Sequence, residues 1–480
     1  MGNKKIVEKH QKLFILLSMT MAVFLWSLSA GIINISLPTL SQYMDISTSM
    51  VAWVVIIHLV ILTSFLLIFG RLGDFVGYKK IFLMGLFIFA SGSYLCAVSL
   101  NFYHLLFFRI IQGIGSSMLL SVIPAIITLS FDSGSRGKAF GYVSLATTIG
   151  LSMGYGLGGF LDTYTSWRWI FIANIPLAIL TIYCANRYIP VRQKLKKPPS
   201  FDFIGSILTL LTITSFLLLI QVTRNINKLP DWFPLGVILV IVMGVCFVIW
   251  ELKHEAPLFD LHLLRNVHLT ISLLATFLAN LVLTGTIFLV PFYLELIHGY
   301  SADFAGMIIL IPSLLILITG PLSGHLSDSF GSKPVTVLSA LALIISMLIL
   351  SIMDLTVGVI FIFTALAIRA LCEGMFGPAN NKMVMSHSSS EKTGAISSLL
   401  NTARYLGLVM GMVVFQGIFD SVISAQNQQV DLMQPIGAYH IIIPKTALLT
   451  GFQNAFFIGM LISVVIIVLS FLTKENKTNT

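Results

Sequence analysis

Three arginines and one glutamate fall inside long apolar runs of this chain, where a charge is costly and is therefore a candidate for function. Arg369 and Glu373 lie four residues apart, which places both side chains on one face of a helix. Arg404 and Arg109 lie in two other apolar runs. An acid that can pair with an arginine could bind and release a proton, which is the chemistry of ion-coupled transport.

Two interpretations of Glu373 are open. In the first, Glu373 forms a neutralising pair with Arg369 or with Arg404 and has only a structural role. In the second, it exchanges its proton or its arginine partner when a substrate binds. Glu373 is the only carboxylate that we place within a spanning helix away from the helix ends, so we expect it to carry the coupling.

Other polar residues are weaker candidates for the same pathway. His58 lies near the middle of an apolar run, and imidazole titrates near neutral pH. A lone helical histidine is also compatible with ordinary packing. Asn34 is a polar group on a helix that could line a cavity. Arg109 is about five residues, roughly 7–8 Å, from the outer end of its helix, so snorkelling to the membrane surface is an alternative to a functional role.

Other chemistries find no support in the sequence. The chain has no G-x-x-x-x-G-K-S/T phosphate-binding loop, so we expect no direct use of ATP. Its four cysteines lack C-x-x-C spacing, which argues against a disulfide framework and against a metal site. No Ser-His-Asp-like grouping has support from its context. We therefore expect neither an enzyme nor a bound cofactor, and a proton is the expected coupling ion.

A membrane is needed to position these residues. The chain is 57% hydrophobic and 10% charged, whereas soluble domains carry about 25% charged residues. Because a spanning helix needs about 20 apolar residues, the chain reads as an all-α polytopic membrane protein with about fourteen spans. The predicted spans are 13–36, 49–70, 80–99, 104–129, 138–160, 167–188, 203–222, 233–251, 268–292, 304–323, 334–352, 357–381, 394–418 and 449–472.

Lysine and arginine are unevenly distributed between the loops. They concentrate in alternate loops, and the intervening loops contain only Arg168, Arg224, Lys228 and Lys445. Because basic loops stay in the cytoplasm, we expect a multi-pass protein of the cell membrane with both termini cytoplasmic. The longest segment between spans, 419–448, is then on the outside. The same bias accounts for the net charge of +9 without a nucleic-acid partner.

A glycine-punctuated turn occurs twice in the chain. The first copy contains Gly70, Arg71, Gly73, Asp74, Gly77 and Lys79, and the second contains Gly324, Asp328 and Gly331. Gly150 and Gly154 likewise match Gly407 and Gly411. We therefore expect a six-helix half over 13–188, a basic linker with two inserted helices over 189–252, and a second six-helix half over 268–472. Parallel halves around a central site are typical of transporters.

Both glycine patterns suggest a mechanical role. In the turn, glycine lets the chain reverse without a Cβ clash, and Asp74 could meet a helix N-terminus or an arginine of a neighbouring helix. The alternative is that the basic residues of the turn only fix the topology. Gly150, Gly154 and Gly158 form one bare stripe, which favours close helix packing. The sharper hypothesis is that this stripe moves against the other half.

These motifs resemble those of the major facilitator superfamily, and within it the fourteen-helix drug:proton antiporter branch. The turn 70–80 is similar to the loop motif of the superfamily. Residues 109–115, with Gln112, match its fourth-helix pattern R-x-x-Q-G-x-G, and 150–159, ending in Gly159, is similar to its fifth-helix antiporter motif. Segments 34–38 and 167–176 match first- and sixth-helix patterns of the branch. The resemblance covers nearly the whole chain.

The resemblance implies the major facilitator fold. It also implies a proton relay that includes Arg109, and a cytoplasmic turn whose contacts hold the halves together and favour the outward-facing state. Four positions depart from the branch. The branch usually has Asp, Tyr, Pro and Gln at these positions, and this chain has Ser29, His58, Tyr155 and Glu295 in their place. Glu295 is expected to face solvated headgroups at the outer end of its helix.

We therefore expect a secondary transporter that exports small amphipathic compounds in exchange for protons, by alternating access. Its expected partners are the substrate and the lipid bilayer, and it should work as a monomer. One alternative is a dedicated metabolite exporter or importer on the same fold. Another is a membrane sensor that does not transport.

Overall fold

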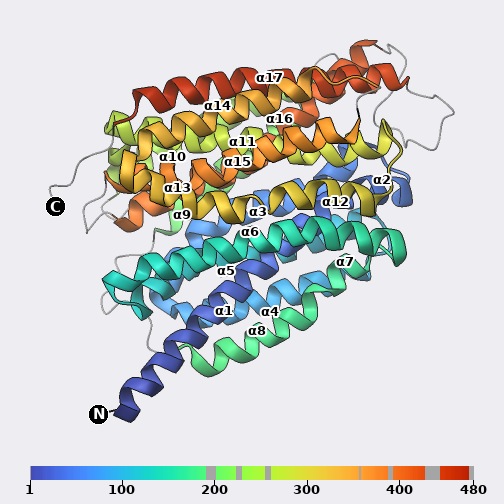
Figure 1. Cartoon of the computed structure of the whole chain (residues 1–480). Helices are drawn as coiled ribbons and strands as arrows, with labels where there is room; N and C mark the ends of the chain where they lie inside the picture. The colour runs from blue at the N-terminus through green and yellow to red at the C-terminus, as the bar shows by residue number, and fades with distance from the viewer. Residues whose placement is uncertain are drawn as a thin grey trace.

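The computed structural model describes residues 2–190, 202–222, 230–254, 261–355, 358–387, 393–426 and 444–474. Regular structure in these ranges is helical throughout (Figure 1). The N-terminal half contains α1 (Gly2–Ile35), α2 (Leu37–Met44), α3 (Thr48–Val76), α4 (Tyr78–Ala97), α5 (Phe102–Ser130), α6 (Ser133–Tyr164), α7 (Trp169–Ile172) and α8 (Asn174–Tyr188). Two inserted helices follow, α9 (Phe203–Val222) and α10 (Phe233–Lys253), and then the short 3-10 helix η2 (Leu261–Arg265).

The C-terminal half contains α11 (Val267–Leu296), α12 (Ala302–Ser313), α13 (Ile316–Phe330), α14 (Ser332–Ser351), α15 (Val359–Met385), α16 (Thr393–Gln426) and α17 (Lys445–Leu472). Most of the linker predicted over 189–200 and most of the segment 419–448 lie outside the described residues. The predicted fold class, an all-α polytopic membrane protein of two halves with an inserted pair, is confirmed.

Twelve stretches of the described residues are long and apolar enough to cross a membrane. Two of the predicted spans are not among them. Span 138–160 corresponds to α6, whose many Gly, Ser and Thr residues lower its hydropathy. Span 203–222 corresponds to α9, whose stretch Phe203–Phe216 counts as a shorter apolar helix. The composition of α6 reflects close packing, because small residues let helix backbones approach.

The two halves repeat one packing scheme. A Cβ added to Gly154 of α6 would lie 2.6 Å from the Leu28 backbone oxygen of α1. The equivalent distance in the C-terminal half is 2.3 Å, from Gly411 of α16 to the Leu281 oxygen of α11. The glycine-punctuated turns repeat as well, since Gly77 has φ of 103° and Gly331 has φ of 86°. Only glycine adopts such angles without strain, which explains glycine at both turns.

One end of the bundle carries the start of α1 and the end of α17 (Figure 1, left). We call it the basic end, because the turn with Arg71 and Lys79 lies there. Lys79 Nζ donates to the Asn186 oxygen near the end of α8, and Gln11 near the start of α1 donates to the Tyr188 oxygen. The other end of the bundle is called the opposite end.

The inserted helices lie beside a seam between the halves. α9 packs on α3 of the N-terminal half and on α16 of the C-terminal half. The Ser64 and Thr214 hydroxyls, 3.2 Å apart, connect α3 to α9. Leu62 and Leu66 of α3 also pack directly on Tyr405 of α16. This seam is therefore closed.

The second seam is closed at the opposite end and open toward the basic end. α12 packs closely on α6: a Cβ on Gly159 would lie 2.3 Å from the Ala302 oxygen, and one on Gly306 would lie 2.5 Å from the Tyr155 oxygen. α13, which continues α12 toward the basic end, has little contact with α6. In α6, residues 140–142, 144 and 145 are all exposed, whereas Ala139 and Val143 pack in the core of the N-terminal half. The halves therefore part here.

Candidate functional site

A cavity of about 50 Å³ lies where α6 and α13 begin to part. The N-terminal half contributes Thr147, Thr148, Leu151, Ser152 and Tyr155 from α6, and the C-terminal half contributes Ser313, Ile316, Arg369 and Glu373. We call this space the central cavity. Because both halves line it, any change in their separation changes its shape. It is also mostly polar in its side chains, which is unusual at membrane depth.

Arg369 and Glu373 form an ion pair in the wall of this cavity. Arg369 Nη1 lies 2.9 Å from Glu373 Oε2, and the exposed fractions of the two side chains are 4% and 27%. The pairing follows from their four-residue spacing on α15. The sequence left open whether Glu373 pairs with Arg369 or with Arg404. The structure has the pair with Arg369, and Arg404 donates instead to Asn381 Oδ1 at 3.2 Å. Glu373 is the more accessible partner, as a group that exchanges protons with water should be.

Arg109 lies in a separate polar cluster inside the N-terminal half. Its side chain is 2% exposed, so it does not snorkel to the surface. Arg109 Nε donates to the Val54 oxygen at 2.8 Å, and its Nη1 donates to Gln112 Oε1. Gln112 in turn donates to Ser93 Oγ at 2.7 Å. Arg109 and Gln112 therefore hold α3, α4 and α5 together, and neither lines the central cavity.

His58 and Asn34 are also enclosed by the N-terminal half. His58 is 6% exposed, and its Nε2 lies 3.2 Å from Ser116 Oγ of α5. Asn34 is 6% exposed, and its Nδ2 donates to the Ala30 oxygen of its own helix. The structure thus brings Arg369 and Glu373 together in the wall of the central cavity, and it places Arg109, Gln112, His58 and Asn34 elsewhere.

The glycine stripe of α6 packs within its own half. A Cβ on Gly150 would lie 2.6 Å from the Phe24 oxygen of α1, and one on Gly158 would lie 2.9 Å from the Ile32 oxygen. The hypothesis that this stripe moves against the other half is therefore wrong for Gly150, Gly154 and Gly158. Gly156 and Gly159, which face α12, meet the C-terminal half instead. A bare helix face predicts a close neighbour but does not identify it.

The charged groups of the two turns bind within their own halves. The Asp74 carboxylate accepts from the Tyr78 hydroxyl and lies 3.6 Å from Arg71 Nη1. The arginine beside Asp74 is thus on the same helix, and not on a neighbouring one as proposed from sequence. In the second turn, Lys382 Nζ of α15 lies 2.7 Å from Asp328 Oδ1. Among the described residues, neither carboxylate reaches the other half, as expected when the basic ends are apart.

We expect Asp74→Asn to slow transport more than Asp328→Asn. The Asp74 side chain is 14% exposed, whereas that of Asp328 is 73% exposed and its ion pair is screened by water. A buried hydrogen bond to a charged group contributes about 1.5–3 kcal/mol, so a roughly tenfold loss of turnover is expected for Asp74→Asn. Initial transport rates in proteoliposomes measure both variants. Equal losses would contradict the difference that burial implies.

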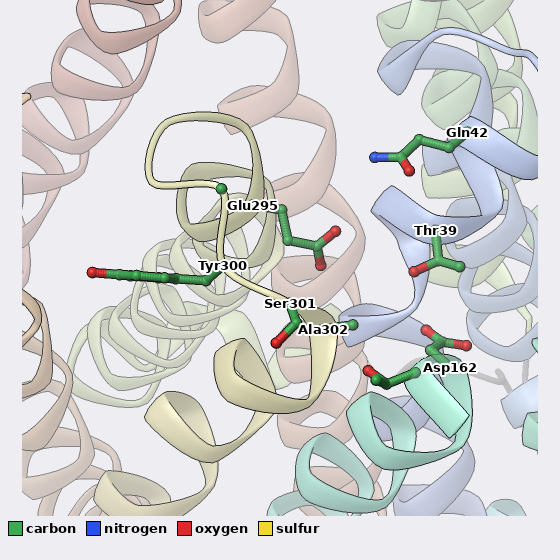
Figure 2. Close-up of a pocket in the computed structure, with 9 residues that line it drawn as sticks. Thr39, Gln42, Asp162, Glu295, Tyr300, Ser301 and Ala302 are labelled. Carbon is green, nitrogen blue, oxygen red and sulfur yellow. The ribbon is translucent and has the colours of Figure 1, made fainter. Parts of the chain in front are cut away.

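A second cavity, of about 350 Å³, lies between the halves at the opposite end. Figure 2 shows Glu295 of α11 and Asp162 of α6 pointing into this space from the two halves. Both carboxylate oxygens of Asp162 and one of Glu295 are buried and accept no hydrogen bond from a described residue. Glu295 therefore does not face headgroups, and the prediction from sequence that it does is wrong. The departure from the usual Gln marked Glu295 as unusual, but no local signal identified its neighbour Asp162.

We expect Glu295→Gln to stabilise the protein, and more so at high pH. Two ionised carboxylates in one buried space repel each other, and burial itself disfavours their charged forms. At about pH 8 the glutamine removes one of these charges, whereas at about pH 5 a larger fraction of the acids is protonated and less is gained. The gain should be about 1–3 kcal/mol at the higher pH. Thermal unfolding in detergent at both pH values measures it.

Asp303→Asn is the matched control for this experiment. Asp303 is a partly exposed acid at the same end of the bundle, and it accepts hydrogen bonds from Thr163 and Tyr164. Because it is solvated and has partners, we expect no gain from its replacement. A Glu295→Gln gain that is larger at about pH 5 than at about pH 8 would rule out repulsion between ionised acids as its source.

Comparisons with known proteins agree with this architecture. The model of the Major Facilitator Superfamily matches residues 19–412. The chain is 29% identical over 409 residues to the riboflavin transporter RibZ of Clostridioides difficile (strain 630), covering 85% of this chain and 88% of the relative. It is 27% identical over 338 residues to the multidrug export protein EmrB of Escherichia coli (strain K12), covering 69% and 65% of the two chains.

Solved structures show the same fold. A bacterial homolog of the human lysosomal transporter Spinster, in an inward-facing and unoccupied conformation, superimposes with a TM-score of 0.66 at 16% identity and covers 96% of both chains. A D-xylose-proton symporter gives a TM-score of 0.66 at 16% identity, covering 97% of this chain and 98% of the other. With its two repeated halves and the cavity between them, the chain belongs to the Major Facilitator Superfamily and is a multi-pass membrane transporter.

Proposed function

We propose that the protein is a proton-coupled exporter of small amphipathic compounds, of the fourteen-helix drug:proton antiporter branch. The observation that carries this proposal is the Arg369–Glu373 ion pair in the wall of a cavity lined by both halves. An ionisable pair at membrane depth is costly, and a purely structural role would be met at lower cost by apolar residues. At the seam between moving halves, the pair can exchange a proton during each cycle.

The proposed cycle uses alternating access. The basic end faces the cytoplasm, since basic loops stay inside, so the parted seam between α6 and α13 corresponds to the inward-facing state. Substrate enters the central cavity from this side, and Glu373 releases its proton there. Each inward proton supplies about 2.3 kcal/mol per 100 mV of membrane potential. In this proposal the protein acts as a monomer in the cell membrane and uses neither ATP nor a bound cofactor.

A compound with a large apolar surface fits the surroundings of the cavity. The exposed part of α6 includes Phe140, Tyr142 and Leu145, and α13 exposes Ile318 and Leu322. In this proposal, such apolar side chains contact an amphipathic molecule on its way in. The similarity to the multidrug export protein EmrB supports the same class of substrate.

A dedicated metabolite transporter is the second candidate function. The similarity to the riboflavin transporter RibZ extends over 85% of this chain at 29% identity. The first helix also has Ser29 where an acid would attract organic cations, and Arg404 lies on α16 near the seam without an acidic partner among the described residues. These features favour a neutral or anionic compound, and riboflavin is a reasonable first compound to assay.

Substrate-driven proton flux in proteoliposomes tests both candidates. The purified protein would be reconstituted with a pH-sensitive dye inside, and fluorescent cations, neutral dyes and riboflavin would be added in turn. Antiport predicts an internal pH change that requires both substrate and protein. If an imposed pH gradient moves none of the compounds in either direction, proton antiport of these classes is wrong. Transport of riboflavin alone would favour the second candidate.

A further inference from the structure

Tyr155 is the residue through which the N-terminal half reaches the ion pair of the C-terminal half. Its side chain is 2% exposed and lines the central cavity together with Arg369 and Glu373. Its backbone oxygen packs on α12, 2.5 Å from the position of a Cβ at Gly306. Tyr155 therefore lies at the depth where α6 leaves the C-terminal half, beside the space into which the halves part.

The Tyr155 hydroxyl is available for a new bond, whereas several other hydroxyls around the cavity are occupied. Thr147, Thr148 and Ser313 each donate to a carbonyl oxygen of their own helix. Tyr155 makes no side-chain hydrogen bond within the described part of the chain, and it lies close enough to Arg369 and Glu373 to feel both charges. A phenol hydroxyl donates readily to a carboxylate, and a bond to an ionised acceptor is roughly twice as strong as a neutral one.

Few titratable or charged groups face Glu373. On its own helix these are Arg369 and the buried Cys372 thiol. α6 contributes Tyr155, while α12 and α13 contribute Ser313 and Ile316, which do not titrate. α16 contributes Arg404, whose hydrogen bond goes to an amide of α15. Among the side chains that line the cavity from α6, the Tyr155 phenol is therefore the one that titrates.

We propose that Tyr155 is a positioning residue that links the charge of Glu373 to the separation of the two halves. When the basic end is closed, its hydroxyl donates to the ionised Glu373 carboxylate and holds α6 against α15. Protonation of Glu373 removes the charge that makes this bond strong, so the halves part and the basic end opens. Once open, Glu373 loses its proton to the basic side and pairs with Arg369. This inference rests on the proposed proton coupling.

The opening of the basic end can be measured with a cysteine at position 144. Ser144 of α6 is exposed beside the opening, so Ser144→Cys places a thiol where access depends on the separation of the halves. Of the native cysteines, Cys246 is exposed and would be replaced by serine, while the other three are buried. Labelling by a hydrophilic maleimide, normalised to the reaction of a free thiol at each pH, is expected to be faster at about pH 5.5 than at about pH 8.

Tyr155→Phe removes one oxygen atom and is the decisive variant. With the hydroxyl gone, the basic end should stay open at high pH, so labelling at about pH 8 should rise at least about threefold, to the wild-type rate at about pH 5.5. Tyr155→Gln, which restores a donor, should recover part of the pH dependence. Glu373→Gln should give the same flat profile as Tyr155→Phe. Tyr183→Phe, at an exposed tyrosine of α8, is the control and should keep the wild-type profile.

A wild-type pH profile in Tyr155→Phe would overturn the proposal, as would a wild-type reporter whose labelling does not depend on pH. The melting temperatures of the variants show whether each is folded. Failure of the proposed function is a separate result. If the wild-type protein moves no protons with any compound, antiport is wrong, and a labelling profile that depends on both Tyr155 and Glu373 would still establish the link between them.

Discussion

Replacing Glu373 with glutamine is expected to abolish transport driven by a pH gradient while the protein remains folded. Glutamine keeps the shape of the side chain and can accept a hydrogen bond from Arg369, but it cannot carry a proton in and out of the cavity. The charge-assisted bond that is weakened contributes about 1.5–3 kcal/mol, which corresponds to roughly a 10- to 150-fold shift in an equilibrium. Uptake of substrate into proteoliposomes, with and without a pH gradient, measures the effect.

A double-mutant cycle separates coupling from stability. Glu373→Gln leaves Arg369, whose side chain is only 4% exposed, without its counter-charge, and this should lower the melting temperature. Because Glu373 is 27% exposed, solvent screening keeps this loss below that of a fully buried pair. Adding Arg369→Gln removes the unpaired charge and should recover stability without restoring transport. If Glu373→Gln keeps the pH dependence of wild-type transport, Glu373 does not carry the coupled proton.

Replacing Gly154 with alanine is expected to cause a large loss of stability. The new Cβ would lie 2.6 Å from the Leu28 oxygen and 2.8 Å from both the Gly31 Cα and the Ile32 nitrogen. All three atoms belong to the backbone of α1, so no side chain can rotate away and the helices must separate. Overpacking of this kind costs about 1–3 kcal/mol, occasionally more. Thermal unfolding in detergent and the yield of folded protein measure it.

Gly141→Ala is the matched control, because it makes the same change on the same helix. No atom lies within 4 Å of the Cβ position at Gly141. Alanine there should be neutral or stabilising by about 0.5–1 kcal/mol, since glycine is the poorer helix former. Gly411→Ala, at the repeated position in α16, should behave like Gly154→Ala, because its Cβ would lie 2.3 Å from the Leu281 oxygen. Similar melting temperatures for the Gly154 and Gly141 variants would show that α1 and α6 are not in backbone contact.

Features that depend on neighbours along the chain were predictable from the sequence. Apolar runs long enough to span a membrane predict helices regardless of their partners. The four-residue spacing of Arg369 and Glu373 makes their pairing a property of α15 itself. Gly77 and Gly331 mark turns because their positive φ angles are a local requirement. The repeat of these local patterns was enough to predict two halves of one fold.

Contacts between helices were decided only by the tertiary structure. The glycine stripe of α6 predicted a close neighbour, but whether that neighbour was α1 or a helix of the other half depends on how α6 is rotated in the bundle. Arg109 carried the same charge as Arg369, yet the packing of α3 and α5 enclosed it in one half.

For the same reason, the sequence could not predict which residues meet across the seam between the halves. Glu295 and Asp162 each look like an ordinary residue at a helix end, and they become unusual only because α11 and α6 bring them to one cavity. Sequence by itself determined the fold class and the repeat, and it placed Arg369 and Glu373 on one face of α15. Helix rotation and the relative placement of the halves, set by contacts between residues far apart in the chain, decided that Tyr155 faces Glu373.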